Sequence, residues 1–319
     1  MLVAVAATGT GLLSYQLSSF FSQKFKGMGL TGIDVHKVDR TVTAEMGGTA
    51  VILSVIFGSG LLIAFDGERN LVFVSALVAV TLAGVIGLAD DYFDLRQRDK
   101  AFLIGAASIP LGLSVNGLGN IAFPFIGGIS FGALTTVFVV PLALTTAANF
   151  SNMLAGFNGL EAGIATISLG TLSFLAAATG QWEGAVLGIL LLVACLGFLT
   201  INWYPAKIFP GDAGTLMFGA GLAAIGLISH LVFAAVVLCM PAALDFALKL
   251  QSRHPFGQRR IFGNSQVDQD GTLVPPAYPA LAHAFMQVAP TTEKGLVVLL
   301  LLTEALFACL AVVLTLFFM

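Results

Sequence analysis

The sequence predicts an all-α polytopic membrane protein with about ten transmembrane helices. Apolar residues make up 57% of the 319 residues, and charged residues make up only 10%. The mean hydropathy of +0.96 is far above that of a soluble domain of this size. Apolar stretches of about 18 residues or more recur along the whole chain, and an α-helix needs this length to cross a bilayer.

Ten apolar stretches account for the predicted helices. They cover residues 2–21, 46–65, 71–89, 101–115, 131–148, 163–178, 185–201, 215–229, 231–250 and 295–319. Residues 251–294 form the one long polar segment. In it an Asp270-Gly271 turn between two β-prone runs predicts a small hairpin before the last helix. We therefore expect a single integral membrane domain over residues 1–319, with residues 251–294 as a cytoplasmic loop insertion.

The distribution of Lys and Arg predicts the orientation in the membrane. If the helices alternate in direction, 13 of the 14 basic residues lie on or at the border of one side, and only Arg69 lies on the other. The positive-inside rule makes the basic side cytoplasmic. An even number of helices then places both termini on the outer side. Because the chain is short and its loops are minimal, a plasma membrane is favoured over endoplasmic reticulum.

The segment from Asn149 to Gly163, which reads NFSNMLAGFNGLEAG, is unusually polar for this chain. It brings together Asn149, Asn152, Asn158 and Glu161, and buried polar groups of this kind need partners. We interpret the segment as the polar end of a helix, where amide groups and a carboxylate contact a polar substrate. The alternative is an ordinary loop rich in Asn and Gly between two membrane spans.

A second polar segment, GLADDYFDLRQRDK, runs from Gly87 to Lys100. Asp90 and Asp91 emerge directly from an apolar helix, and adjacent carboxylates repel each other unless a cation or a proton lies between them. A hard ion such as Mg²⁺ suits this arrangement, because it prefers carboxylate and phosphate oxygens. Arg96, Arg98 and Lys100 could hold phosphate. The alternative is a solvated charged loop.

A third segment, FPGDAGT, contains Asp212 between two glycines in front of an apolar helix. An Asp at such a start can be a simple N-cap. It can also be a metal ligand, with the free backbone N–H groups of the helix start available to an anion. Asp90, Asp91, Glu161 and Asp212 all lie at the cytoplasmic ends of the predicted helices, so we expect the chemistry at the cytoplasmic face.

The remaining polar residues have less specific interpretations. Arg253 and His254 are placed to meet a sugar or a phosphate. Asp245 and Lys249 are four residues apart near a helix end, which favours a local ion pair. The other histidines that lie on the polar side, His36 and His283, are expected to be structural or solvated.

Taken together, these segments resemble the polyprenyl-phosphate N-acetylhexosamine-1-phosphate transferase superfamily. The resemblance extends from about Gly29 to the C-terminus, and the motif NMLAGFNGLEAG is similar to the corresponding motif of the eukaryotic and archaeal branch. That branch comprises the UDP-N-acetylglucosamine–dolichyl-phosphate N-acetylglucosaminephosphotransferases. The matching residues are Asp90-Asp91 with Asp94 and Lys100, Asn149 to Gly163, and Asn202-Trp203-Tyr204-Pro205 followed by Gly211-Asp212.

The resemblance implies an enzyme, a Mg²⁺-dependent glycosyl-1-phosphate transferase with a cytoplasmic site, with Mn²⁺ as the alternative cofactor. It would transfer N-acetylglucosamine 1-phosphate from UDP-N-acetylglucosamine to a polyprenyl phosphate such as dolichyl phosphate and release UMP. This is the first lipid-linked step of glycan assembly, including protein glycosylation. The implied protein is a homodimer in membrane lipid, and no nucleic acid is expected as a partner.

The resemblance also implies residue roles. Asn152 and Asp212 would coordinate the metal ion. Asp90 and Asp91 would serve the acceptor phosphate, and Lys100 would hold phosphate charge. Asn158 would recognise uracil, and Asn149 and Glu161 would shape the same pocket. Glu45 would lie on the nucleoside side of the substrate. Arg253 and His254 would recognise the N-acetylated sugar. Pro255 stands where the eukaryotic pattern has a second Arg.

Two other functions remain open at this point. The same reaction class can use another UDP-N-acetylhexosamine or a peptidoglycan precursor, although the Asn-rich segment disfavours the precursor. A secondary transporter is the alternative of another class. It would require charges near the bilayer midplane and two repeated halves, whereas the charges here gather at one face and no repeat is visible.

Overall fold

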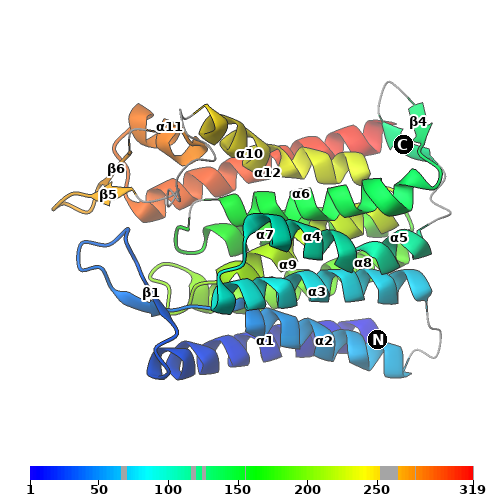
Figure 1. The fold of residues 1–319 in the computed structure, drawn as a ribbon, viewed down its shortest axis with the longest axis horizontal. Coiled ribbons are helices and arrows are strands. Elements are labelled where there is room, and N and C mark those ends of the chain that lie inside the picture. Colours follow the sequence, from blue (N-terminus) through cyan, green and yellow to red (C-terminus); the bar gives the residue numbers. More distant parts are fainter. Residues whose placement is uncertain are drawn as a thin grey trace.

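The computed structural model describes residues 1–65, 70–115, 120–123, 127–154, 156–251, 265–276 and 278–318. Long helices run side by side through it (Figure 1). The helices are α1 (Leu2–Gly27), α2 (Gly48–Phe65), α3 (Leu71–Phe93), α4 (Gln97–Ala107), α5 (Ile109–Ser114), the π-helical η1 (Thr135–Val139), α6 (Val140–Met153), α7 (Leu160–Ala178), α8 (Trp182–Asn202), α9 (Gly211–Ile228), α10 (Val232–Leu250), α11 (Leu281–Val288) and α12 (Glu293–Phe318). Short strands pair into antiparallel hairpins: β1 (Thr31–Ile33) with β2 (Val42–Ala44), β3 (Asn120–Phe123) with β4 (Gly127–Ser130), and β5 (Gln266–Val267) with β6 (Leu273–Val274).

The all-α polytopic class is confirmed. Within the described ranges, 8 helices are long and apolar enough to cross a membrane, namely α2, α3, η1 with α6, α7, α8, α9, α10 and α12. The two further predicted spans, 2–21 and 101–115, lie on α1 and on α4 with α5. The buried positions of α1 include Thr10, Ser14 and Ser18, which lowers its hydropathy, and α4 ends at Ala107 before α5 begins. The count of ten therefore stays a prediction.

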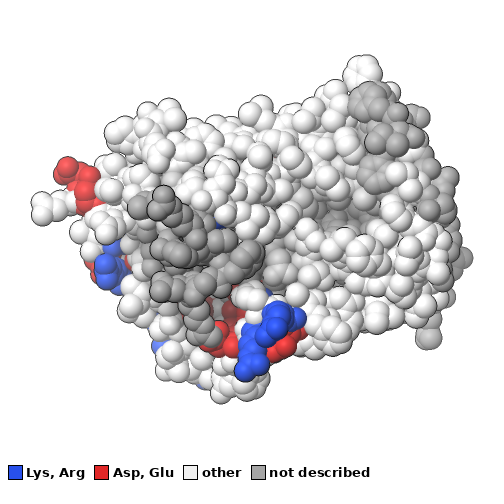
Figure 2. Space-filling view, turned by 45° about the horizontal axis from the view of Figure 1, so that its top comes forward, with Lys and Arg blue, Asp and Glu red and all other residues white. Residues whose placement is uncertain are grey.

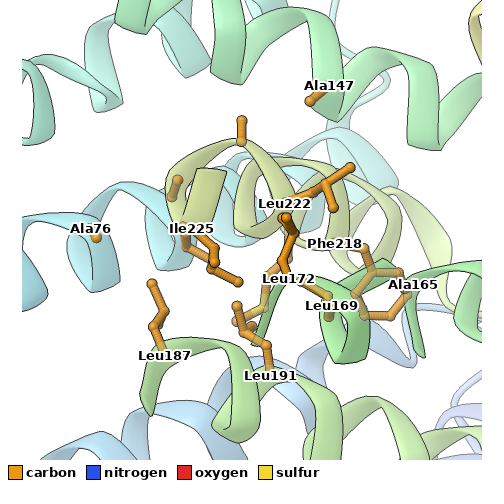
Figure 3. Close-up of a cluster of buried hydrophobic side chains, with 14 of the residues drawn as sticks. Ala76, Ala147, Ala165, Leu169, Leu172, Leu187, Leu191, Phe218, Leu222 and Ile225 are labelled. Carbon is orange, nitrogen blue, oxygen red and sulfur yellow. The ribbon is translucent and has the colours of Figure 1, made fainter. Parts of the chain in front are cut away.

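Helix α9 lies at the centre of the bundle. Every residue from Ala213 to Ile228 is buried, and a helix that is apolar on all sides belongs in a core. It packs against α2, α3, α6, α7 and α8. Figure 3 shows Phe218, Leu222 and Ile225 of α9 among leucines of its neighbours. The central position of α9 matters for function, because Asp212 lies in its first turn.

Glycines allow the helices around the start of α9 to approach closely. A Cβ added to Gly87 of α3 would lie 2.2 Å from the carbonyl oxygen of Asp212, and one added to Gly48 would lie 2.0 Å from the backbone nitrogen of Gly214. Small residues permit such contacts between the backbones of membrane helices. The ends of α2 and α3 and the start of α9 are thereby held together.

The two ends of the bundle differ in composition. Figure 1 shows both termini at one end, together with β4, and β1, β5 and β6 at the other. In the face shown in Figure 2, Lys, Arg, Asp and Glu gather over the end that carries β1, β5 and β6 and over the middle of the molecule. In this view no described Lys, Arg, Asp or Glu is seen at the end that carries the termini.

The polar segments contain more regular structure than the sequence predicted. The hairpin before the last helix is present as β5–β6, with its turn at Asp268 to Thr272. However, the residues between the first two predicted helices, 22–45, contain β1–β2, and residues 251–294 also contain α11. These elements are too short to give a clear period in the sequence.

Candidate active site

Asp90 and Asp91 lie inside the last turn of α3. The sequence predicted a charged loop from residue 90 to residue 100, but α3 continues to Phe93 and α4 begins at Gln97. Asp94 ends α3 in the left-handed conformation, with φ of 51°, which Asp tolerates better than most residues. The helix extends past its apolar stretch because the turn that carries the two carboxylates has specific partners.

Asp91 caps the start of α9. Its Oδ1 accepts a hydrogen bond from the backbone N–H of Asp212 at 2.7 Å, and its Oδ2 accepts one from Ala213 at 3.1 Å. Gly211 has φ of 64°, and an added Cβ there would lie 2.5 Å from Asp91 Oδ2, so glycine is required by both conformation and space. Two backbone N–H groups of the helix start therefore donate to a side chain of the protein itself, so they are not free for another anion in this structure.

Lys100 joins two of the predicted site residues. Its Nζ lies 2.7 Å from Asp90 Oδ2 and 2.7 Å from Asp212 Oδ2. The lysine side chain is 1% exposed, whereas that of Asp212 is 26% exposed. Burial by itself would lower the pKa of Lys100, but the carboxylates of Asp212 and Asp90 outweigh burial and raise it. An ammonium group is thus held between two carboxylates that would otherwise repel each other.

Asn152, near the end of α6, completes the group. Its Nδ2 donates to Asp212 Oδ2 at 3.0 Å, and its Oδ1 accepts from the hydroxyl of Thr215 at 2.9 Å. Asp212 is not the N-cap of α9, since Pro210 occupies that position. We call Asp90, Asp91, Lys100, Asn152 and Asp212 the carboxylate cluster.

The donor atoms of this cluster fit a hard divalent cation. Three carboxylates and one amide converge from α3, α6 and α9, and Mg²⁺ prefers oxygen ligands of this kind. Asp212 and Asn152 are the residues that would hold Mg²⁺, because both oxygens of Asp91 accept backbone N–H groups. To offer its oxygen, Asn152 would have to turn its amide, since its Nδ2 now faces Asp212 Oδ2 and its Oδ1 accepts from Thr215. Lys100 would then remain to neutralise Asp90.

Two further predicted residues lie near this cluster without joining its hydrogen bonds in the described residues. Asn149 lies three residues before Asn152 on α6, and its Nδ2 donates to the carbonyl oxygen of Thr145 at 2.7 Å. Glu45 follows β2 and lies within electrostatic range of Asp91. Burial raises the pKa of the Glu45 carboxyl above its ordinary value.

Asn158, the predicted uracil reader, belongs to a different cluster. It is 1% exposed. Its Nδ2 donates to Asp34 Oδ2 at 3.0 Å and to Glu293 Oε1 at 2.6 Å, while its Oδ1 accepts from the backbone N–H of Ala206 at 2.6 Å. In this structure its amide joins four segments of the chain. The neighbouring residues Asp34 and Glu293 were not singled out from the sequence, because nothing local marks either as a partner of Asn158.

Glu161 is buried in the first turn of α7. Its Oε1 lies beside Gly156, so it faces the break between α6 and α7. That Glu161 shapes the substrate pocket stays a prediction from the family resemblance. Arg253 and His254, predicted to read the sugar, lie outside the described residues.

The Asp245–Lys249 pair reaches beyond its own helix. The sequence predicted a local ion pair, and Lys249 Nζ does lie 2.5 Å from Asp245 Oδ2. Both side chains are buried. In addition, Lys249 Nζ donates to the carbonyl oxygen of Met153, the last residue of α6, and Asp245 Oδ1 accepts from the backbone N–H of Leu281 in α11. The pair therefore links the residue after Asn152 to the polar segment before α12.

A cavity of about 1180 Å³ opens beside this polar segment. Its described lining includes Lys26, His36, Lys37, Lys207 and Glu293, and it includes no residue of the carboxylate cluster. The carboxylate cluster brings oxygen donors of three helices around a buried lysine, so we propose it, rather than this cavity, as the place of the chemistry.

The fold and the site define a class of polytopic membrane proteins that hold carboxylates and a lysine together at one end of the bundle. Residues 73–230 match the model of glycosyl transferase family 4. A protein of Saccharolobus solfataricus, provisionally named UDP-N-acetylglucosamine–dolichyl-phosphate N-acetylglucosaminephosphotransferase, is 33% identical over 95% of this chain and 93% of its own length. A protein of Sulfolobus acidocaldarius with the same provisional name is 35% identical over 90% of this chain and 88% of its own.

Bacterial relatives match a smaller part. The phospho-N-acetylmuramoyl-pentapeptide-transferase of Halalkalibacterium halodurans is 34% identical over 59% of this chain and 61% of its own length. The chain belongs to glycosyl transferase family 4. It is an integral, multi-pass membrane protein and a glycosyl transferase, and the family resemblance drawn from the motifs is confirmed.

Proposed function

We propose that this protein transfers N-acetylglucosamine 1-phosphate from UDP-N-acetylglucosamine to a polyprenyl phosphate of the dolichyl type, releasing UMP. The observation that carries the proposal is Lys100 held between Asp90 and Asp212, with Asn152 on the same carboxylate. Bringing two phosphate groups together requires buried positive charge and oxygen ligands for a metal ion. The names of the archaeal relatives support the two substrates.

The reaction forms one P–O bond and breaks another. An oxygen of the acceptor phosphate attacks the β-phosphorus of the nucleotide sugar, and the bond from that phosphorus to the bridging oxygen breaks, so that the electron pair leaves with UMP. The acceptor phosphate is mostly ionised near neutral pH and needs little proton removal. Asp90 orients Lys100 toward the phosphates, and Asp91 fixes the first turn of α9 and thereby Asp212.

Mg²⁺, when bound, would supply positive charge to the phosphate oxygens, and Mn²⁺ is the alternative ion. Asn152 and Asp212 would hold it. Asn149, Asn158 and Glu161 are proposed to shape the nucleoside pocket with Glu45, and Arg253 with His254 to read the sugar. For Asn158 this role requires that its amide exchange a present partner for uracil, since the described structure gives each of its polar atoms a partner.

A transfer assay on the purified protein tests the proposal. UDP-N-acetylglucosamine labelled in the sugar is supplied with dolichyl phosphate and Mg²⁺. We expect organic-extractable label with one UMP released per sugar, its loss with EDTA, and its recovery when Mg²⁺ is restored. An Asp212→Asn protein should be inactive. Release of UDP in place of UMP would mean that the sugar moves without its phosphate, and the proposal would fail.

The second candidate is the same reaction with a peptidoglycan precursor or another UDP-N-acetylhexosamine. The bacterial relatives favour it, but they cover less of the chain than the archaeal ones. UDP-N-acetylmuramoyl-pentapeptide added to the same assay separates the two: label transfer from it alone would select the second candidate. Membership of a transferase family disfavours the transporter. A homodimer, a cytoplasmic site and a plasma membrane location remain part of the proposal.

A further inference from the structure

We propose that Asp34, His36 and Glu293 bind a second divalent cation of the kind that accepts an imidazole ligand, such as Zn²⁺. The three residues are buried, and each offers a ligand atom, all within 4.8 Å of one another. Asp34 and His36 lie in the loop between β1 and β2, and Glu293 is the first residue of α12. The site goes beyond the proposed transfer reaction and does not depend on it.

An unpartnered oxygen points to a ligand at this site. Glu293 is 3% exposed, and its Oε1 accepts from the backbone N–H of Asn158 at 2.7 Å and from its Nδ2 at 2.6 Å. Among the described residues, Glu293 Oε2 is buried and has no hydrogen-bond partner. Leaving a buried polar atom unpaired is costly, and a cation within reach of this oxygen removes the cost.

The charged groups at this site have a net negative charge that a cation can balance. Two carboxylates meet here, and Lys37 Nζ, 2.7 Å from Asp34 Oδ2, balances one of them. A divalent ion exceeds the remaining negative charge by one, which a hydroxide or another small anion at an open coordination position balances. The lysine does not compete for the ion, because it lies against the carboxylate of Asp34 and can support that ligand from outside.

The donor set distinguishes this site from the carboxylate cluster. Asn152 and Asp212 offer oxygen atoms, as Mg²⁺ prefers. Asp34, His36 and Glu293 offer two carboxylates and one imidazole, which suits Zn²⁺ with metal–ligand distances of about 2.0–2.2 Å. The imidazole of His36 is held against the ring of Phe157, with centroids 4.2 Å apart. The three ligand atoms lie within 4.8 Å of one another, so a movement of roughly 1 Å by each toward a common centre would place them around one ion.

An entry path reaches the site. His36, Lys37 and Glu293 line the cavity of about 1180 Å³, so an ion can arrive from solvent and keep a water molecule or an anion as a further ligand. The bound ion would join the β1–β2 loop to the start of α12, with Asn158 hydrogen-bonded to both carboxylates. We therefore expect it to stabilise the end of the bundle that carries the hairpins.

The experiment measures zinc directly in the full-length protein. Detergent-solubilised protein is stripped with EDTA, freed of chelator, incubated with Zn²⁺ in excess Mg²⁺, which occupies the oxygen-donor site, and desalted. Metal content and X-ray absorption at the zinc edge are then recorded with the thermal midpoint. We expect one retained zinc per chain with one imidazole ligand and a higher midpoint, and at least ~10-fold weaker zinc binding in Glu293→Gln and His36→Asn.

The chain contains 4 histidines, which supply matched controls. His230→Asn, His254→Asn and His283→Asn should retain zinc, and so should Asp212→Asn. His36→Cys should restore zinc with a sulfur ligand, which separates loss of a ligand from loss of folding. Equal zinc in His36→Asn and wild type would overturn the proposal. So would a folded wild-type protein that retains no zinc, since Glu293 would then carry a proton in place of a metal.

Discussion

Lys100 is the residue on which the carboxylate cluster depends. Its ammonium group lies between Asp90 and Asp212 and is almost completely buried. The long side chain lets Lys100 reach from α4, and its compact ammonium group can contact two carboxylates that come from different helices. The sequence predicted a lysine that holds phosphate charge, and the structure adds that the same lysine positions the two aspartates.

Lys100→Met should abolish most of the activity. We expect kcat to fall about 10²–10³-fold, the range for removal of one preorganised group that stabilises transition-state charge, and a lower thermal midpoint because the carboxylates then repel. The transfer assay and a thermal scan measure the two effects. Lys24→Met, at the exposed end of α1, is the matched control. Retention of full activity by Lys100→Met would contradict the role.

Glu45 provides a prediction for pH. Burial raises the pKa of its carboxyl above 4.5, so the folded state holds the proton more tightly than the unfolded chain does. The stability that this proton provides is present below the unfolded pKa and is lost as the pH rises through the folded pKa. Glu45→Gln should therefore gain in thermal midpoint relative to wild type as the pH rises above about 4.5. A difference that stays constant with pH would argue against the shift.

At the scale of elements, the site depends on how closely α3 approaches α9. Gly87 of α3 faces the backbone at Asp212, where an added Cβ would lie 2.2 Å from a carbonyl oxygen and 2.6 Å from the nitrogen of Ala213. Asp91 of the same helix caps α9 only because the two backbones are so close. The three-residue connection between Phe93 and Gln97 then returns α4, with Lys100, to the same place.

Gly87→Ala should displace the first turn of α9. We expect a loss of about 1–3 kcal/mol from overpacking and a loss of activity from the displaced Asp212, measured by thermal scan and transfer assay. Gly60→Ala in α2 is the control, since an added Cβ there meets nothing within 4 Å. The control should be neutral or slightly more stable, because Ala favours helix more than Gly does. Equal behaviour of the two variants would refute the close approach as a cause.

The Asp245–Lys249 pair connects α10 to both α6 and α11, and a double-mutant cycle tests this link. Lys249→Met should cost about 3–5 kcal/mol, because it leaves the buried charge of Asp245 without its cation. It should also raise KM, since the end of α6 next to Asn152 loses the bond to Met153. Asp245→Leu combined with Lys249→Met should be less destabilised than the sum of the single changes. Strict additivity would show that the pair is not coupled.

At the scale of the whole molecule, the two ends of the bundle differ in charge. The hairpins β1–β2 and β5–β6 lie at the end opposite the termini (Figure 1), and the segments that carry the lysines belong to that end. Lys37, Lys207 and Lys294 line one cavity there. The positive-inside rule therefore predicts that this end lies in the cytoplasm.

Cysteine labelling tests the orientation. The native cysteines, Cys195, Cys239 and Cys309, are first replaced. Gln181→Cys, between α7 and α8, should react with a membrane-impermeant maleimide in intact cells, whereas Lys207→Cys should react only after the membrane is opened. The two positions lie on opposite ends of α8, so they serve as controls for each other. The reverse pattern would invert the proposed topology and place the site outside.

The sequence by itself determined the membrane class, predicted the chemistry at one end of the bundle and singled out the members of the carboxylate cluster. These follow from hydropathy, from the distribution of Lys and Arg, and from residue types such as the paired Asp90 and Asp91, which are unfavourable without a cation. Each is a local or statistical property, so no tertiary contact has to be known.

Only the tertiary structure decided which groups are partners. Asp91 binds the start of α9, 121 positions away, and Asn158 contacts Glu293 across 135 positions. Lys249, which the sequence assigned to its own helix, reaches α6. Such contacts depend on helices that cross at glycines and on loops brought together by the bundle, and no spacing along the chain records them. The sequence therefore specified the chemical groups, and packing determined what each group holds.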